Sequence, residues 1–423
     1  MPTPSLILVP ARFKTGKLYT PVATTSGGLV LGASGDFNVT RATTATRVNA
    51  SGLIESVASG IPRLDYPLGG GCPALLVEPS GSNLALQSED FSTTWGRVRI
   101  NAFGSGSVAN TTGTLDPYGT NLADYLQEDT AVADTHRIQQ TVAVVSGTTY
   151  TISCFLKSAE RFQAALFVLQ GGVSRYVVFN LASGTATATN ATGSIENYGN
   201  GWYRGRATFT ATASGNVAPN LYLCDDSGNI SYTGTGTKGI YAFGFQFEAS
   251  PIATSYIPTT TGSVTRNADV INVSGAVSGC IGQTEGTIYA EFEYKTNTTD
   301  RRLIALSNGT TSDRVMLWTL NNILYAQVEA GSIILASPIT EGYHKLAFAY
   351  QQNGVSGTLF ASLDGGAVVS GTSSTFPASL TDINIGKSET TATSTFFWNA
   401  RIRAVALYTT RLTNQELAAL TTL

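Results

Sequence analysis

The sequence predicts an all-β chain of two antiparallel β-sandwiches of the jelly-roll type, preceded by an extended segment and closed by a short helix. The chain has 423 residues, and because single cores seldom exceed about 250–300 residues, at least two domains are expected. Charged residues make up 13%, against about 25% in typical domains. Strong helix formers are therefore scarce, and the frequent Thr, Val and Ile favour pleated sheets. Short alternating runs of apolar and polar residues complete the case.

The charge balance excludes whole classes of partner. With Lys+Arg 25 against Asp+Glu 28, the formal net charge is −3, so no basic field attracts nucleic acid or anionic lipid. No stretch approaches the roughly 20 apolar residues of a membrane span, and the start lacks the basic region of a secretory signal. We expect a chain that is made in the cytoplasm, binds no nucleic acid and does not insert into a membrane.

Residues 1–85 are predicted to form an extended N-terminal docking segment. Prolines and glycines are scattered through it, and its apolar runs are as short as Leu75-Leu76-Val77. Because proline removes a ladder donor and glycine weakens a strand, the segment lacks a core of its own. We expect contacts with partner subunits to order it, and its deletion to leave soluble sandwiches that fail to assemble.

Residues 86–262 are predicted to form the first sandwich. Apolar side chains recur with a period of two at Tyr150, Ile152, Cys154 and Leu156. This alternation is typical of a half-buried strand. A second run of the same period begins at Tyr241, and the Asn- and Gly-rich stretch 197–201 is typical of a turn between strands.

Residues 263–423 are predicted to form the second sandwich. One face of a predicted strand is apolar, at Ile288, Ala290, Phe292 and Tyr294. The Asp364-Gly365 pair indicates a tight hairpin. Thr413 as N-cap and Glu416 three residues later form a capping box, which predicts one short helix at the end of the chain.

The four cysteines are predicted to be free thiols. Cys72, Cys154, Cys224 and Cys280 lie far apart and lack the paired spacing of zinc or redox motifs. Cys154 and Cys224 share the first sandwich and are the only plausible pair, but a cytoplasmic assembly route does not favour a disulfide. No metal and no cofactor are expected.

The N-terminal segment and both edges of the first sandwich resemble a segment of tailed-phage fibre and head-spike proteins. The stretches that carry the resemblance are Phe37 to Glu55, Pro62 to Tyr66, Cys72 to Glu78, Phe247 to Pro258 and Val264 to Asp269. In those proteins this segment commonly precedes a sandwich that resembles carbohydrate-binding jelly rolls. The resemblance therefore implies the same fold for residues 86–262.

The last part of the chain is similar to laminin-G or concanavalin-like lectin sandwiches. The matching stretches are Gly342 to Leu346, Leu363 to Gly365, Ile383 to Gly386 and Phe397 to Ile402, followed by the closing helix. The calcium ligands of the lectin members find no matching acidic cluster in this sequence.

Together the resemblances imply a bacteriophage virion structural protein. It would be a tail or head fibre or a decoration subunit on the virion surface, a homotrimer that docks on other virion proteins through residues 1–85. Its sandwiches would then bind host surface polysaccharide. Two alternatives stay open: a polysaccharide depolymerase tailspike, and a purely structural capsid cement protein.

No catalytic residue is assigned. Glycoside hydrolysis needs two carboxylates about 5–9.5 Å apart, and any acidic sequence offers such pairs. Asp225-Asp226-Ser-Gly228-Asn229 is better explained as a turn. His136 and His344 fall in different predicted domains, so a triad has no basis.

Aromatic side chains are the candidates for sugar binding, because an aromatic face stacks on a sugar ring and amide groups bind its hydroxyls. The candidates are Trp95, Trp202, Tyr203, Trp398 and Asn399. Core packing is the alternative for each, since most of the aromatic residues of a sandwich are buried.

Overall fold

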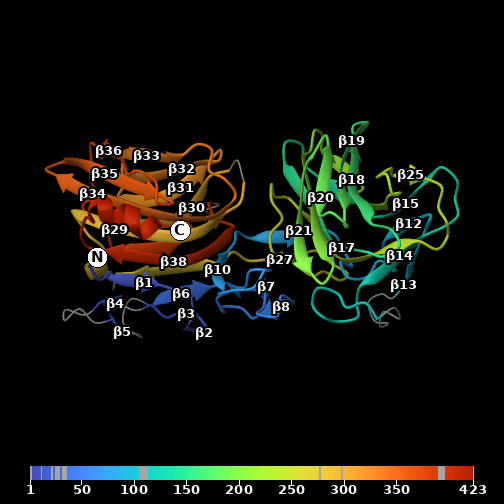
Figure 1. Cartoon of the computed structure of the whole chain (residues 1–423), viewed down its shortest axis with the longest axis horizontal. Helices are drawn as coiled ribbons and strands as arrows, with labels where there is room; N and C mark the ends of the chain where they lie inside the picture. The colour runs from blue at the N-terminus through green and yellow to red at the C-terminus, as the bar shows by residue number, and fades with distance from the viewer. Residues whose placement is uncertain are drawn as a thin grey trace.

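The chain forms two lobes, and each lobe is a pair of antiparallel sheets packed face to face (Figure 1). The computed structural model describes residues 2–10, 12–20, 22–23, 29–30, 36–103, 113–275, 278–296, 299–388 and 396–422. Both termini lie in the same lobe (Figure 1). The predicted all-β fold class with antiparallel sandwiches and one short C-terminal helix is confirmed.

The first lobe, called here the terminal sandwich, contains a ten-stranded and a nine-stranded sheet. The ten-stranded sheet has the order β36 (Val369–Ser373), β35 (Ser356–Leu363), β34 (Gly342–Asn353), β29 (Glu285–Tyr294), β38 (Ala400–Tyr408), β1 (Leu6–Leu8), β4 (Val22–Ala23), β5 (Leu29–Val30), with β10 (Ala74–Val77) also on β38 and β9 (Leu64–Asp65) on β10. The nine-stranded sheet has the order β2 (Phe13–Lys14), β3 (Lys17–Leu18), β6 (Phe37–Thr40), β28 (Val270–Ser274), β37 (Asp382–Ile385), β30 (Arg301–Ser307), β31 (Arg314–Leu320), β32 (Ile323–Val328), β33 (Gly331–Ala336).

The second lobe, called here the middle sandwich, contains a seven-stranded and a six-stranded sheet. The seven-stranded sheet has the order β12 (Gly96–Val98), β15 (Asp134–Gln139), β24 (Asn220–Leu223), β18 (Gln163–Gln170), β19 (Val173–Asn180), β20 (Thr185–Thr189), with β25 (Ser231–Tyr232) on β15. The six-stranded sheet has the order β13 (Ile100–Phe103), β14 (Asp124–Glu128), β26 (Gly239–Glu248), β17 (Thr149–Ser158), β22 (Trp202–Thr210), β21 (Thr192–Gly199).

Small elements complete the chain. Three two-stranded pairs are β7 (Ala45–Val48) with β8 (Ile54–Val57), β11 (Gly81–Asn83) with β27 (Val264–Arg266), and β16 (Val142–Val144) with β23 (Gly215–Val217). A 3-10 turn, η1 (Ser278–Cys280), precedes β29, and α1 (Asn414–Thr421) packs on β34 and β35. The capping box expected at Thr413 and Glu416 is present.

Alternating side chains build both cores as predicted. Tyr150, Ile152, Cys154 and Leu156 lie in the core of the middle sandwich, but the prediction of a half-buried strand is wrong, because Thr151, Ser153 and Phe155 on the other face are at most 1% exposed. The set Ile288, Ala290, Phe292 and Tyr294 lies in the core of the terminal sandwich. At the predicted Asp-Gly hairpin, β35 turns back into β36 with positive φ at Asp364 (52°) and Gly365 (71°), a conformation that glycine adopts without strain.

The structure corrects the expectation for residues 1–85. They have no separate core, but most of their strands are integral parts of the terminal sandwich: β1 pairs with β38, β6 with β28, and β10 with β38. Leu6, Leu8 and Phe37 are fully buried in its core. The middle sandwich is therefore inserted between β10 and β28, and the terminal sandwich is built from both ends of the chain. Deletion of residues 1–85 cannot leave this sandwich intact.

The cysteines are free, with Cys72 exposed and the other three buried. Cys154 faces the core of the middle sandwich, whereas Cys224 belongs to a separate apolar cluster with Phe167 and Tyr222. The two thiols thus lie in different clusters. Burial raises the pKa of both thiols well above the ordinary value, which keeps them protonated and unreactive.

Candidate functional site

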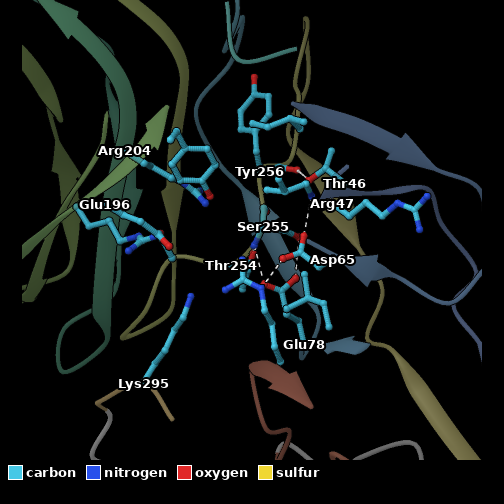
Figure 2. A pocket seen from close by; sticks show the side chains of 17 residues that line it. Thr46, Arg47, Asp65, Glu78, Glu196, Arg204, Thr254, Ser255, Tyr256 and Lys295 are labelled. Atoms are coloured by element: carbon cyan, nitrogen blue, oxygen red, sulfur yellow. Dashed lines mark hydrogen bonds and ion pairs between the residues drawn. The ribbon is translucent and has the colours of Figure 1, made fainter. Parts of the chain in front are cut away.

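A charged cleft lies where the two sandwiches meet (Figure 2). It is a cavity of about 50 Å³ lined by Thr46, Arg47, Val48, Ile54, Asp65, Leu76, Glu78, Glu196, Tyr198, Arg204, Arg206, Ala253, Thr254, Ser255, Tyr256, Lys295 and Arg401. The β7–β8 hairpin, strands β21 and β22 of the middle sandwich, and Lys295 and Arg401 of the terminal sandwich all contribute to its wall. The cleft thus combines side chains from five separate parts of the sequence.

A buried ion cluster beside the cleft fixes the junction. Arg63 Nη1 donates to Glu78 Oε2 at 2.7 Å, and Arg63 also pairs with Asp269. Arg41 Nη1 donates to Asp269 Oδ1 at 2.9 Å, and Arg266 Nη2 lies 3.3 Å from Glu78 Oε2. None of these side chains is more than 6% exposed.

The cluster lies where the chain passes from the terminal sandwich into the middle sandwich and where it passes back. The backbone N–H of Asp269 donates to the carbonyl of Glu78 at 3.0 Å, and the N–H of Glu78 donates to Asp269 Oδ2 at 3.0 Å. All five charged residues belong to the stretches that carry the phage-fibre resemblance, yet the sequence reasoning assigned them no role. Their role in the fold is to tie residues 41–78 to residues 266–269.

The carboxylates of this region are held in the ionised form. Burial alone would raise the pKa of Glu78, but Arg63 and Arg266 outweigh it and hold that pKa well below its ordinary range. Burial likewise opposes ionisation of Glu196, and the attraction of Arg206, Lys295 and Arg401 again lowers its pKa. A general acid of a glycosidase needs a raised pKa, so neither carboxylate fits that role.

These lowered pKa values predict acid lability. A carboxyl group whose pKa is lower in the folded state stabilises the fold fully above its unfolded pKa of about 4.3, and this stabilisation is lost as the pH falls below that value. We expect the melting temperature to drop between about pH 5 and about pH 3, and the drop to be smaller in Glu78→Gln. Thermal unfolding followed by circular dichroism measures both. The exposed Glu160→Gln is the control, and a slope that Glu78→Gln leaves unchanged would contradict the assignment.

Two carboxyl groups with a raised pKa, Asp124 and Glu248, lie away from any open surface. Burial raises the pKa of Asp124 to about 8, and its Oδ2 accepts the Phe91 N–H at 2.6 Å. Burial also raises the pKa of Glu248, whose oxygens accept from Thr254 and Gln246. Both residues are at most 1% exposed, so a polysaccharide has no access to them.

The predicted turn at Asp225 is confirmed. Its Oδ1 accepts from the backbone N–H of Ser227 and of Asn229, at 2.9 and 2.8 Å. His136 and His344 lie in different sandwiches, on β15 and β34. Among the described residues no group of three or more His, Cys, Asp or Glu side chains could hold a metal ion.

The tryptophans predicted to bind sugar are core residues. Trp95, Trp202 and Trp398 are 5%, 2% and 3% exposed, and each indole N–H donates to a backbone carbonyl, of Gln87, Leu115 and Glu293 respectively. Because their faces are covered, they offer no surface for stacking on a sugar in this conformation. Core packing accounts for all three.

The other two predicted sugar-binding residues, Tyr203 and Asn399, are also partly or fully buried. Tyr203 is half-buried and packs against the core of the middle sandwich. Asn399 is 5% exposed and has a positive φ of 62°, which asparagine tolerates better than most residues. The structure brings Trp398 and Asn399 together only as chain neighbours, and the candidates of the two sandwiches do not form a common site.

An aromatic stripe that the sequence reasoning missed crosses the outer face of the nine-stranded sheet. Arg302, Trp318, Tyr325 and Ile334 occupy one register row across β30, β31, β32 and β33. The Trp318 and Tyr325 rings are stacked with centroids 4.4 Å apart, and the Arg302 guanidinium lies 4.8 Å from the Trp318 centroid and 5.0 Å from that of Phe396. Ile334 is 54% exposed and Phe396 38%.

A row of amides lies on the same outer face. Asn38, Asn272 and Asn384 are register neighbours on β6, β28 and β37, while the residues that flank each of them point into the core. Lys17 Nζ donates to Asn38 Oδ1 at 2.8 Å. The sequence obscures this face because Arg314–Leu320 is almost continuously apolar, so it shows no alternation to reveal which side of the strand is outward.

Comparisons with known proteins leave the family open. No family model matches the chain, and no curated protein does. Among solved structures, the CBM40 module of a Ruminococcus gnavus IT-sialidase bound to α2,3-sialyllactose is similar at 16% identity, with 35% of this chain and 88% of that chain covered and a TM-score of 0.30.

Two further structures match to a similar extent. A mutant NanB sialidase of Streptococcus pneumoniae has 14% identity over 36% of this chain and 26% of that chain, with a TM-score of 0.31. Domain 4 of AbnA, a GH43 extracellular arabinanase of Geobacillus stearothermophilus, in complex with arabinotriose, has 15% identity over 40% and 82%, with a TM-score of 0.28. Because one fold can host many unrelated functions, a likeness this distant carries no function over to this chain.

No helix in the described part of the chain has the length and apolar content needed to cross a membrane.

Proposed function

We propose that the chain is a non-enzymatic structural and adhesive protein of a bacteriophage particle. It acts as a tail or head fibre or decoration subunit on the virion surface and binds host surface polysaccharide. The sequence resemblance supports the virion role, and the low charge and sandwich architecture suit a rigid display protein. Attachment to other virion proteins involves the N-terminal region, and the resemblance favours a homotrimer.

The observation that carries the adhesive role is the outer face of the nine-stranded sheet. There the stripe of Trp318, Tyr325 and Phe396 shares a sheet face with the partly exposed Asn272, whereas Asn384 in the same amide row is 5% exposed. Among the described residues the Asn272 side chain has no hydrogen-bond partner. Aromatic faces and free amides are the groups that recognise the C–H face and the hydroxyls of a sugar.

The test is glycan binding by the purified chain and by variants of this face. We expect wild-type protein to bind a subset of host capsule or lipopolysaccharide glycans on an array, and Tyr325→Ala or Asn272→Asp to weaken that binding about tenfold, as loss of one aromatic or polar contact would. Tyr176→Ala is the matched control, because Tyr176 stacks on Phe167 on the outer face of the middle sandwich at 5.8 Å.

The same incubations separate the alternatives. The proposal predicts no release of shortened oligosaccharide, whereas reducing-end release that an acid-to-amide variant abolishes would establish a depolymerase. Absence of all glycan binding, together with normal assembly of the particle, would instead favour a purely structural cement protein.

A further inference from the structure

We propose that the cleft between the sandwiches binds one oxyanion, a carboxylate or a phosphate group, through Arg204. This inference is independent of the adhesive role. It starts from a cation that the fold buries without an anionic partner. Arg204 is 2% exposed and lines the cleft.

Arg204 has few contacts for a buried charge. Its Nη2 donates to Ser153 Oγ at 3.0 Å, and its guanidinium lies 5.2 Å from the centroid of Phe155. Its Nε is buried without a hydrogen-bond partner in the described part of the chain. Burying a cation without a counter-charge is strongly unfavourable, so a bound anion would satisfy a need that the protein leaves open.

The carboxylates that line the cleft are already engaged. Glu196 pairs with Arg206, and Asp65 accepts from Arg401 Nε at 2.6 Å. Glu78 pairs with Arg63 and accepts from Ser255 Oγ at 2.7 Å.

Glu248 is the remaining carboxyl group that interacts electrostatically with Arg204. Its two oxygens already accept from Thr254 and Gln246, and burial raises its pKa. No carboxylate of the described cleft therefore serves as the direct partner of Arg204.

Other cations surround the same space. Figure 2 shows Lys295 reaching into the cleft from the terminal sandwich while Arg204 enters from the middle sandwich. Arg206 also lines the cleft, where its guanidinium pairs with Glu196. An anion held here would contact groups of both sandwiches and brace them against one another.

The size of the cavity limits the ligand. At about 50 Å³ it exceeds the roughly 10–15 Å³ that one water needs on the same measure, but it is far smaller than the pocket of a drug-sized ligand. It admits a single small oxyanion or one such group of a larger molecule. Arg47, with a side chain 20% exposed, marks a wall of the cleft that is open to solvent.

Anion binding is tested by isothermal titration and thermal unfolding in a buffer free of oxyanions. The probes are inorganic phosphate, acetate, an oligomer of a uronic acid and a neutral oligomer of the same length. We expect phosphate or a carboxylate probe to raise the melting temperature of the wild-type chain, and the neutral oligomer to have no effect at this site. Response to the acidic oligomer alone identifies a glycan as the source, and response to phosphate alone identifies a free anion.

Variants decide whether Arg204 is responsible. Arg204→Gln is expected to weaken anion binding about tenfold or more, since a charge-assisted hydrogen bond is lost, and to remain as stable as wild type without anion. If Arg204→Gln does not fold, Lys295→Gln tests the same site, because it is also expected to weaken anion binding. Arg137→Gln, a cation on the outer face of the middle sandwich, and Tyr325→Ala should respond like wild type. The proposal would be overturned if the wild-type chain responded to no anion, or if Arg204→Gln and Lys295→Gln both responded as strongly as wild type.

Discussion

Replacing Asp269 by asparagine is expected to lower the free energy of unfolding by about 3–5 kcal/mol, the usual cost of removing one partner from a buried ion pair. The substitution leaves Arg41, Arg63 and Arg266 buried with Glu78 as their remaining carboxylate. It also removes charge from the acceptor of the Glu78 N–H, at the point where the chain enters and leaves the middle sandwich. Denaturant unfolding followed by circular dichroism measures the loss.

A matched control is available on the surface. Asp134 pairs with Arg99 at 2.9 Å, but its side chain is 39% exposed, so Asp134→Asn should leave stability nearly unchanged. A second readout is limited proteolysis, because loosening of the junction should expose cleavage sites near residues 78–81 and 264–269. An Asp269→Asn chain as stable and as resistant to protease as wild type would show that the cluster does not hold the junction.

Placing a charge at Leu8 is expected to prevent folding of the terminal sandwich, even though the residue lies near the start of the chain. Leu8 is fully buried on β1, which pairs with β38 across almost the whole length of the sequence. Truncation of a buried leucine costs about 2–5 kcal/mol, and a buried unpaired carboxylate adds to that cost. Leu8→Asp should therefore be recovered largely in the insoluble fraction.

The adjacent residue supplies the control. Val9 is 53% exposed, so Val9→Asp should yield soluble protein with an unchanged melting temperature. A chain lacking residues 1–80 should behave like Leu8→Asp, because it also loses β6 and β10 from the two sheets. Soluble, cooperatively folding protein from Leu8→Asp would restore the idea of a separable docking segment.

Local patterns predicted the strands and the last helix well. Alternation at Tyr150 to Leu156 and at Ile288 to Tyr294 identified core faces, because side chains on a strand point to opposite sides with a period of two. The Asp364-Gly365 turn and the Thr413 capping box were also readable, because each depends on residues within a few positions of one another. The burial of the aromatic candidates could not be predicted in this way. A tryptophan in a strand can pack in the core or lie on the surface, and the neighbouring residues do not distinguish the two.

The sequence by itself determined the all-β class, the core faces of its clearest strands and the short closing helix, because these follow from the periodicity and chemistry of neighbouring residues. The tertiary structure alone decided which strands pair. It placed Leu6–Leu8 beside β38, inserted the middle sandwich into the terminal one, and gathered Arg63, Glu78 and Asp269 into one buried cluster. These contacts join residues hundreds of positions apart, and their stability comes from packing and desolvation, which no local pattern encodes.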